Sequence, residues 1–174
     1  MDKFVPDMYQ KNIYVIDYEG LKKRGIKCII FDLDNTLTSP TSIKTSKKLI
    51  KLIDDLYEMN FKVIIMSNNF KKRIAPVKDA LRVDCLAMAM KPLTFGFYKI
   101  LKRYHLQKSE VVIIGDQLLT DIWGGNKTGI TTILVNPVSL VDDITWTKFN
   151  RILEKWVMKR LIKKDLFAKG RYYE

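Results

Sequence analysis

The chain has 174 residues and a formal net charge of +12, and a surface this basic favours anionic partners such as nucleic acid, anionic lipid or phosphorylated substrates. Two cysteines and one histidine exclude a disulfide framework and a Cys-rich zinc site, and they leave little for a histidine-based metal site or a Ser-His-Asp triad. No apolar stretch reaches the roughly 18–20 residues that a membrane-spanning helix needs, so we expect a protein of the reducing cytoplasm.

In chain order, short apolar runs alternate with amphipathic stretches. The runs are typical of buried strands and occupy residues 27–33, 61–66, 84–89, 111–114 and 131–135. Apolar residues at helical spacing predict helices between the runs, at residues 43–60, 74–83, 94–104 and 120–127. Strands that alternate with helices of this length form right-handed β-α-β units. We therefore predict an α/β fold, a Rossmann-like three-layer sandwich with a five-stranded parallel sheet.

Polar residues follow four successive predicted strands. In chain order, these candidate site residues are Asp32, Asp34, Ser67, Asn68, Lys91, Asp116 and Asp121. In a parallel sheet the ligand site lies beyond the carboxyl ends of the strands, so we expect the seven side chains to meet at one edge. Each feature alone also fits an ordinary loop, turn or cap. Their occurrence in order at four strand ends favours a single functional site.

The chemistry of these side chains indicates work on phosphate. Several carboxylates without a histidine suit a hard cation with oxygen ligands, and magnesium (Mg²⁺) fits best. Asp32 and Asp34 leave an extended strand on the same side, where two close negative charges are costly unless a cation lies between them. The hydroxyl of Ser67 and the amide of Asn68 can bond phosphate oxygens, and Lys91 can neutralise charge on a transferring phosphoryl group.

These motifs resemble those of the haloacid dehalogenase (HAD) superfamily of phosphotransferases. The superfamily's D-x-D-x-T motif, its strand ending in Ser or Thr, its basic residue and its acidic motif are matched by residues 32–36, residues 64–68, Lys91 and residues 115–121. The superfamily pattern spans about residues 27–135. The resemblance implies the HAD fold and an enzyme that transfers phosphoryl groups.

The resemblance also implies a role for each candidate residue in catalysis. Asp32 would attack phosphorus and carry an aspartyl phosphate. Asp34 would protonate the leaving oxygen and then activate water, and an aspartate at this position is what phosphatase members carry. Ser67, Asn68 and Lys91 would hold the phosphoryl oxygens.

A metal site is implied by the same resemblance. Mg²⁺ would be held by Asp32, by the backbone carbonyl of Asp34 and by Asp116. Asp121 would support the metal shell or orient Lys91. The cofactor expected for this chain is therefore Mg²⁺ alone.

Two longer stretches, residues 16–38 and 115–138, look like the small bacterial YqeG family of HAD subgroup IIIA, which is similar to the mitochondrial phosphatidylglycerophosphate phosphatase. This resemblance implies a phospholipid head-group phosphate as the substrate. The gaps at residues 38–61 and 69–91 are too short for the cap domain that many HAD enzymes insert there. A site without a cap domain is open and suits a phosphate on a large or membrane-borne molecule, unless another subunit supplies a lid.

The C-terminal part of the chain is strongly basic. We expect one domain over residues 1–174, with a basic amphipathic helix at about 147–168. Six apolar residues at helical spacing are expected to form one face of this helix: Phe149, Ile152, Leu153, Trp156, Val157 and Leu161. This helix is either the last core helix with a solvated basic face or a surface for peripheral contact with an anionic membrane or a nucleic-acid backbone. Alternative functions are a phosphatase for RNA, the ribosome or a phosphoprotein, and a binding protein without turnover. The presence of both Asp32 and Asp34 favours an enzyme.

Overall fold

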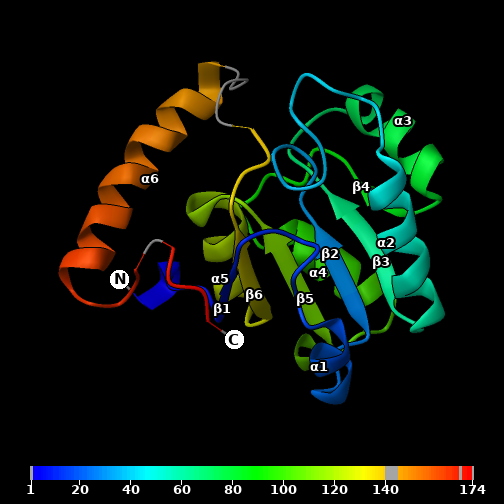
Figure 1. Cartoon of the computed structure of the whole chain (residues 1–174), viewed down its shortest axis with the longest axis horizontal. Coiled ribbons are helices and arrows are strands. Elements are labelled where there is room, and N and C mark those ends of the chain that lie inside the picture. Colours follow the sequence, from blue (N-terminus) through cyan, green and yellow to red (C-terminus); the bar gives the residue numbers. More distant parts are fainter. Residues whose placement is uncertain (1, 140–144, 169, 174) are drawn as a thin grey trace.

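A computed structural model describes residues 2–139, 145–168 and 170–173, with only the backbone described for residues 145–151. The strands form one six-stranded sheet in the order β1-β6-β5-β2-β3-β4, and every neighbouring pair is parallel (Figure 1). The strands are β1 (Met8–Gln10), β2 (Cys28–Phe31), β3 (Lys62–Met66), β4 (Asp84–Leu86), β5 (Val111–Gly115) and β6 (Thr131–Val135). The predicted α/β class is confirmed.

The sheet has six strands rather than the predicted five, because the N-terminal segment adds β1 beside β6. Its three residues, Met8–Gln10, are all buried. The carboxylate of Asp7, just before the strand, accepts hydrogen bonds from the backbone N–H and the hydroxyl of Thr132 at 2.8 and 3.0 Å. Three residues that include a glutamine are too short to show a strand pattern in the sequence, so β1 was missed.

Helices cover both faces of the sheet (Figure 1). They are α1 (Tyr18–Lys23), α2 (Lys47–Glu58), α3 (Lys71–Leu81), α4 (Phe95–Arg103), α5 (Trp123–Thr128) and α6 (Thr145–Lys163), with short helical segments η1 (Asp2–Phe4), η2 (Lys108–Glu110) and η3 (Leu118–Ile122). Helices α1, α2 and α3 share a core with one face of the sheet, and α4 packs on the other face. Helix α6 lies at the β1 side of the molecule, and α3 lies at the β4 side.

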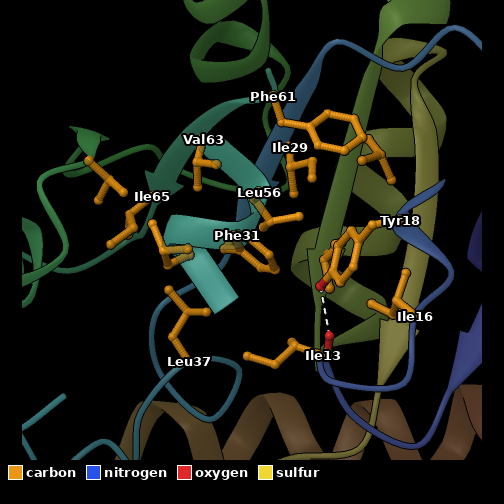
Figure 2. Close-up of a cluster of buried hydrophobic side chains, with 14 of the residues drawn as sticks. Ile13, Ile16, Tyr18, Ile29, Phe31, Leu37, Leu56, Phe61, Val63 and Ile65 are labelled. Atoms are coloured by element: carbon orange, nitrogen blue, oxygen red, sulfur yellow. Dashed lines mark hydrogen bonds between the residues drawn. The ribbon is translucent and has the colours of Figure 1, made fainter. Parts of the chain in front are cut away.

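The central strand β2 is buried on both sides. Ile29 and Phe31 point into the cluster beneath α1, α2 and α3, whereas Cys28 and Ile30 point into the cluster beneath α4. Figure 2 shows the first cluster, where the hydroxyl of Tyr18 donates to the carbonyl of Ile13 at 2.7 Å. Burial on both faces requires a continuous apolar run, which is why this strand is prominent in the sequence.

Several elements differ in their bounds from the sequence prediction. The strand predicted at 84–89 ends at Leu86, and Met88 and Met90 adopt positive φ angles of 51° and 55° that break the strand. The helix predicted at 43–60 begins only at Lys47, where the Ser46 side chain caps the backbone N–H of Leu49 at 3.1 Å. The helix predicted at 74–83 begins earlier, and the one predicted at 120–127 is divided between η3 and α5.

Helix α6 packs on the core with part of its apolar surface. Val157 and Leu161 are buried in a cluster with Tyr9 and residues of η3. The apolar residues expected to share one face are nevertheless divided, because three of them are exposed: Ile152, Leu153 and Trp156. The side chain of Phe149, also expected on that face, lies outside the described residues.

The C-terminal segment is tied to the sheet by hydrogen bonds as well as by packing. The carboxylate of Glu154 in α6 accepts a hydrogen bond from the backbone N–H of Leu118 at the start of η3. Tyr9 and Tyr173 exchange two backbone hydrogen bonds of 2.9 and 3.0 Å. Among the described residues, no helix is both long enough and apolar enough to span a membrane.

Candidate active site

The polar residues singled out in the sequence follow the carboxyl ends of the strands. Asp32 comes directly after β2, Ser67 after β3 and Asp116 after β5. The backbone N–H of Asp32 donates to the carbonyl of Ile114 at 2.9 Å, which extends the pairing of β2 with β5 to the edge of the site. Lys91 lies in the loop that follows β4. Parallel topology thus brings residues that are far apart in the sequence to one edge.

A buried lysine joins two aspartates at the centre of this edge. The Nζ atom of Lys91 donates to Oδ1 of Asp32 at 2.5 Å and to Oδ1 of Asp121 at 2.6 Å. The three side chains are between 1% and 9% exposed. A buried charge must be paired and hydrogen-bonded to be tolerated, and the lysine and the two aspartates meet this requirement for one another.

Burial and mutual charge shift the pKa values of this group in a consistent way. Burial raises the pKa of Asp32 to about 7, although Lys91 acts in the opposite direction, and the charge of Asp121 raises it further. Burial would lower the pKa of Lys91, but the carboxylates of Asp121 and Asp32 outweigh burial and raise it. Lys91 therefore remains a cation next to the carboxylate of Asp32.

A glycine makes room for Asp121. A Cβ atom on Gly115 would lie 2.3 Å from the carboxyl group of Asp121, so no larger residue fits at this position without movement. The second oxygen of Asp121 accepts from the backbone N–H of Gln117 at 3.2 Å. The glycine and this hydrogen bond fix the carboxylate where it can bond Lys91.

Three carboxylates form a cluster that has the composition of a magnesium site. Oxygen atoms of Asp32, Asp116 and Asp121 lie within 4.8 Å of one another, and all three residues are buried. The hydroxyl of Thr36 contacts Oδ1 of Asp116 at 3.4 Å. The cluster offers hard oxygen donors and contains no sulfur or imidazole, which fits Mg²⁺. Its negative charge also exceeds the positive charge of the single lysine. The side chain of Asp34, which follows the cluster in sequence, points elsewhere.

Two residues that sequence reasoning missed hold Asp34. The guanidinium of Arg73, in the first turn of α3, donates to Oδ1 of Asp34 through Nη2 at 2.8 Å and Nε at 3.1 Å. The side-chain amide of Asn69 donates to the other oxygen at 2.7 Å. Arg73 also donates to the carbonyl of Ser39 at 3.0 Å, so it connects α3 to the loop after β2. Both oxygens of Asp34 are therefore fixed in direction.

The signals for these two residues are present but weak in the sequence. Asn69 directly follows Ser67 and Asn68, and Arg73 lies one helical turn further on. Arg73 is one of 31 basic residues, so its charge alone does not mark it. Its Nη1 atom is buried and has no hydrogen-bond partner among the described residues.

Ser67 and Asn68 contribute to the site through the backbone around them. The amide of Asn68 donates to the carbonyl of Lys91 at 3.0 Å and accepts from the backbone N–H of Lys91 at 2.7 Å. The hydroxyl of Ser67 accepts from the backbone N–H of Asn69 at 3.1 Å. Asn68 thus fixes the backbone of Lys91, which directs the lysine side chain toward Asp32.

A cavity of about 520 Å³ opens beside the edge that carries these residues. Thr36 and Thr38 line it, and these threonines contact Asp116 and Arg73 respectively. Lys11 and Lys44 also line it, together with several serines and the loop after β6. Its volume lies in the range of small-molecule sites, and its lysines give it a positive charge.

Comparisons with known proteins identify relatives of this chain. A profile of the HAD-hydrolase-like family matches residues 89–137. The chain is 40% identical over 161 residues to the probable phosphatase YqeG of Bacillus subtilis (strain 168), across 92% of this chain and 93% of that protein. It is 28% identical over 171 residues to the chloroplastic/mitochondrial phosphatidylglycerophosphate phosphatase 1 of Arabidopsis thaliana, across 93% of this chain and 49% of that protein.

A solved structure supports the fold. The crystal structure of a predicted phosphoglycolate phosphatase from Haemophilus somnus matches with a TM-score of 0.54 and 13% identity, over 63% of this chain and 85% of that chain. At this level of identity the likeness concerns the fold alone. It matches the parallel sheet and helical layers described above.

Proposed function

Because the chain belongs to the YqeG family of HAD-type phosphatases, we propose that it hydrolyses phosphomonoesters through a phosphorylated Asp32. The observation that carries the proposal is the buried Lys91 bonded to Asp32 and Asp121. A cation held against one carboxylate oxygen of a buried aspartate leaves the other oxygen for attack on phosphorus. The same cation lies where negative charge gathers on the transferring phosphoryl group.

In the proposed first step, a carboxylate oxygen of Asp32 forms a bond to phosphorus and the ester oxygen of the substrate leaves. Asp34 donates a proton to that oxygen, which departs as an alcohol. In the second step, Asp34 takes a proton from water as the water oxygen attacks phosphorus. The bond between phosphorus and Asp32 breaks, so inorganic phosphate is released and the free carboxylate of Asp32 is regenerated.

The other site residues position these groups. Arg73 and Asn69 bond both oxygens of Asp34, so we propose that Asp34 exchanges one of these hydrogen bonds for contact first with the leaving oxygen and then with water. Asn68 fixes the backbone of Lys91. We propose that Ser67, Asn68 and Lys91 contact the phosphoryl oxygens.

Mg²⁺ is the proposed cofactor. We propose Asp32, the backbone carbonyl of Asp34 and Asp116 as its ligands, with Asp121 supporting the site and orienting Lys91. When bound, the ion would neutralise charge on the phosphoryl group. The clustered carboxylates support this assignment, since one lysine does not balance them.

The proposed substrate is a phosphate on a large or membrane-borne molecule, such as phosphatidylglycerophosphate. The described residues between Thr38 and Lys91 form elements of the central fold and no cap domain, so a bulky substrate has access. The cavity beside Thr36 and Thr38 can receive the leaving group, and its two lysines suit a second phosphate. The name of the Arabidopsis relative supports this substrate class.

The test compares phosphate release, in the presence of Mg²⁺, from phosphatidylglycerophosphate in mixed micelles and from a small aryl phosphate. We expect the lipid to be preferred and the Asp32→Asn variant to release phosphate only at background rate. Asp79→Asn, at an exposed aspartate of α3, is the matched control and should behave as the unsubstituted protein. Normal release by Asp32→Asn would overturn the mechanism, and equal turnover of both substrates would overturn the lipid assignment.

A further inference from the structure

Five large apolar side chains are exposed around the loops that follow β3 and β4, and we call them the apolar rim. They are Phe70 (68% exposed), Phe95 (65%), Met88 (57%), Met90 (54%) and Leu93 (53%). Single exposed apolar residues are ordinary, but a group of five on two adjoining loops is the kind of surface that binds something. The proposed catalytic chemistry does not explain why these five apolar side chains are exposed.

The rim and the catalytic lysine are carried by one segment with alternating exposure. Met88 and Met90 are exposed, whereas Ala89 and Lys91 between and after them are buried. The positive φ angles of Met88 and Met90 produce this alternation in a segment that is not a strand. Such backbone angles are uncommon for residues other than glycine, so the chain accepts local strain here. The segment that directs Lys91 inward thus directs two methionines outward.

Hydrogen bonds join the two loops of the rim to each other and to the site. The backbone N–H of Met88 donates to the carbonyl of Asn69 at 2.9 Å, and that of Ala89 donates to the carbonyl of Ser67 at 3.0 Å. Asn69, next to Phe70, also holds Asp34 through its side chain. The rim is consequently fixed close to the groups that act on phosphate.

The charged residues within the two stretches of chain that carry the rim are all positive. Lys71 and Lys72, directly after Phe70, are exposed on the first turn of α3. The stretches 67–78 and 86–103, which contain the whole rim, include lysines and arginines but no Asp or Glu. Aromatic, Leu and Met side chains at the tip with lysines beside them are the composition of a surface that enters the interface of an anionic bilayer.

We propose that the apolar rim docks the protein onto an anionic lipid bilayer, with the phenylalanine, methionine and leucine side chains among the acyl chains and Lys71 and Lys72 among the lipid phosphates. This proposal rests on the proposed function, because docking by these loops would face the site toward a phosphate carried on a lipid. In this arrangement, the β4 side of the molecule contacts the membrane. Helix α6, with its own exposed apolar and basic residues, lies at the β1 side and is not the docking surface.

The experiment measures co-sedimentation of the full chain with vesicles made of equal parts phosphatidylglycerol and phosphatidylcholine. The test variant carries Phe70→Ser and Phe95→Ser, and serine is a favoured residue at the N-cap position of Phe70. The matched control carries Ile152→Ser and Trp156→Ser, which remove two exposed apolar side chains from α6. Hydrolysis of a small aryl phosphate in detergent-free solution checks that each variant is folded and keeps its chemistry.

We expect the rim variant to lose about tenfold or more in vesicle partitioning, which corresponds to about 1.4 kcal/mol, because two large apolar side chains no longer enter the bilayer interface. The α6 variant should stay within about twofold of the unsubstituted protein, and both should hydrolyse the aryl phosphate normally. Vesicles of phosphatidylcholine alone should bind more weakly, and added salt should weaken binding to the anionic vesicles.

Several results would overturn the docking proposal. These are unchanged vesicle binding by the rim variant, a loss confined to the α6 variant, and no vesicle binding by the unsubstituted protein. A rim variant that dissociates from a dimer or releases RNA, while vesicle binding is unchanged, would assign the rim to a second copy or to RNA instead. Failure of Asp32-dependent phosphate release would overturn the proposed function alone, because vesicle binding is read without turnover.

Discussion

Basic residues flank exposed apolar side chains at both sides of the sheet, but the two surfaces differ in what their segments contact. On the β4 side, the apolar rim belongs to the segments that also carry Lys91 and Asn69, and hydrogen bonds link those segments to Asp32 and Asp34. On the β1 side, Trp156 is exposed on α6, and its neighbours Val157 and Leu161 are buried in a core cluster.

The comparison teaches that composition alone does not assign a role to a basic, apolar surface. The two surfaces have similar residue types, yet one is connected to the site and the other mainly to the hydrophobic core. We therefore expect substitutions of the site residues beside the rim to change catalysis, and substitutions of the buried residues of α6 to change mainly stability. Four variants test this distinction, beginning with the largest expected effect.

Lys91→Met should have the largest effect. It leaves Asp32 and Asp121 buried without their cation, which is expected to lower the free energy of unfolding by about 3–5 kcal/mol. Loss of a cation at the phosphoryl group should also lower kcat by about 10²–10³-fold. Urea unfolding and aryl phosphate hydrolysis measure the two effects. A stable, active Lys91→Met protein would remove the basis for treating the β4 side as catalytic.

Leu161→Ala should affect stability and leave the chemistry intact. Leu161 is fully buried on the inner side of α6, and truncation of such a side chain typically lowers the free energy of unfolding by about 2–5 kcal/mol. The control Ile152→Ala, at an exposed position of the same helix, should change it by less than about 0.5 kcal/mol. Denaturation curves give both values. A marked fall in kcat at temperatures where Leu161→Ala is folded would contradict the distinction between the two sides.

Arg73→Ala should lower activity by about 10–100-fold, because Asp34 loses the group that fixes its orientation. The loss should be larger for an alkyl phosphate than for an aryl phosphate, since a poor leaving group depends more on proton donation by Asp34. Steady-state kinetics on the two substrates measure this difference. Equal losses on both would indicate that Arg73 acts on binding rather than through Asp34. Arg171→Ala, at an exposed arginine near the C-terminus, is the control.

The smallest effect is expected for the ion pair between Lys62 and Asp84, at the amino ends of β3 and β4 and away from the site. The hydrogen bond from Lys62, with another from Tyr104, lowers the pKa of Asp84 from its ordinary value of 3.8. The stability gained is therefore present above that value and is lost as the pH falls through the lowered pKa. For a half-exposed pair we expect less than about 1 kcal/mol.

The measurement for this pair is urea unfolding of Lys62→Met at about pH 7 and about pH 3. The variant should be slightly less stable than the unsubstituted protein at the higher pH, and the difference should shrink at the lower pH as the carboxyl group of Asp84 takes up its proton. Activity should not change, because the amino ends of the strands lie opposite the edge that carries the candidate site. A difference of the same size at both pH values would assign it to packing of the lysine stem instead of the charge pair.

The sequence was most informative where burial imposes a continuous pattern. The apolar runs at Cys28–Phe31 and Val111–Gly115 are covered on both faces, so their strand character and the polar residues after them were predictable. β1 was not, because its three residues depend on pairing with β6 for their structure. The sequence also does not show that Met88 and Met90 end β4, since their backbone angles are set by the loop contacts around them.

The candidate site also contains some residues that the sequence predicts and others that it does not. The aspartates and Lys91 follow strands, so the parallel topology predicted their meeting at one edge. Arg73 and Asn69 were missed because their pairing with Asp34 depends on how α3 packs beside the loop after β2. The divided apolar surface of α6 was also missed, because which side of the helix packs depends on η3, whose π-helical geometry has no marked sequence signal.

The backbone pairing of Tyr9 with Tyr173 has a consequence for the order in which the chain assembles during synthesis. Strands β2 and β3 are neighbours in the sheet and close in sequence, so they can pair while later residues are still being added. β1 can pair on one side only after β6 has been synthesised, and on the other side only after Tyr173 has been synthesised. β1 is synthesised before these partners, so it is among the last strands to join the sheet, and its apolar residues remain accessible to chaperones until β6 has been made.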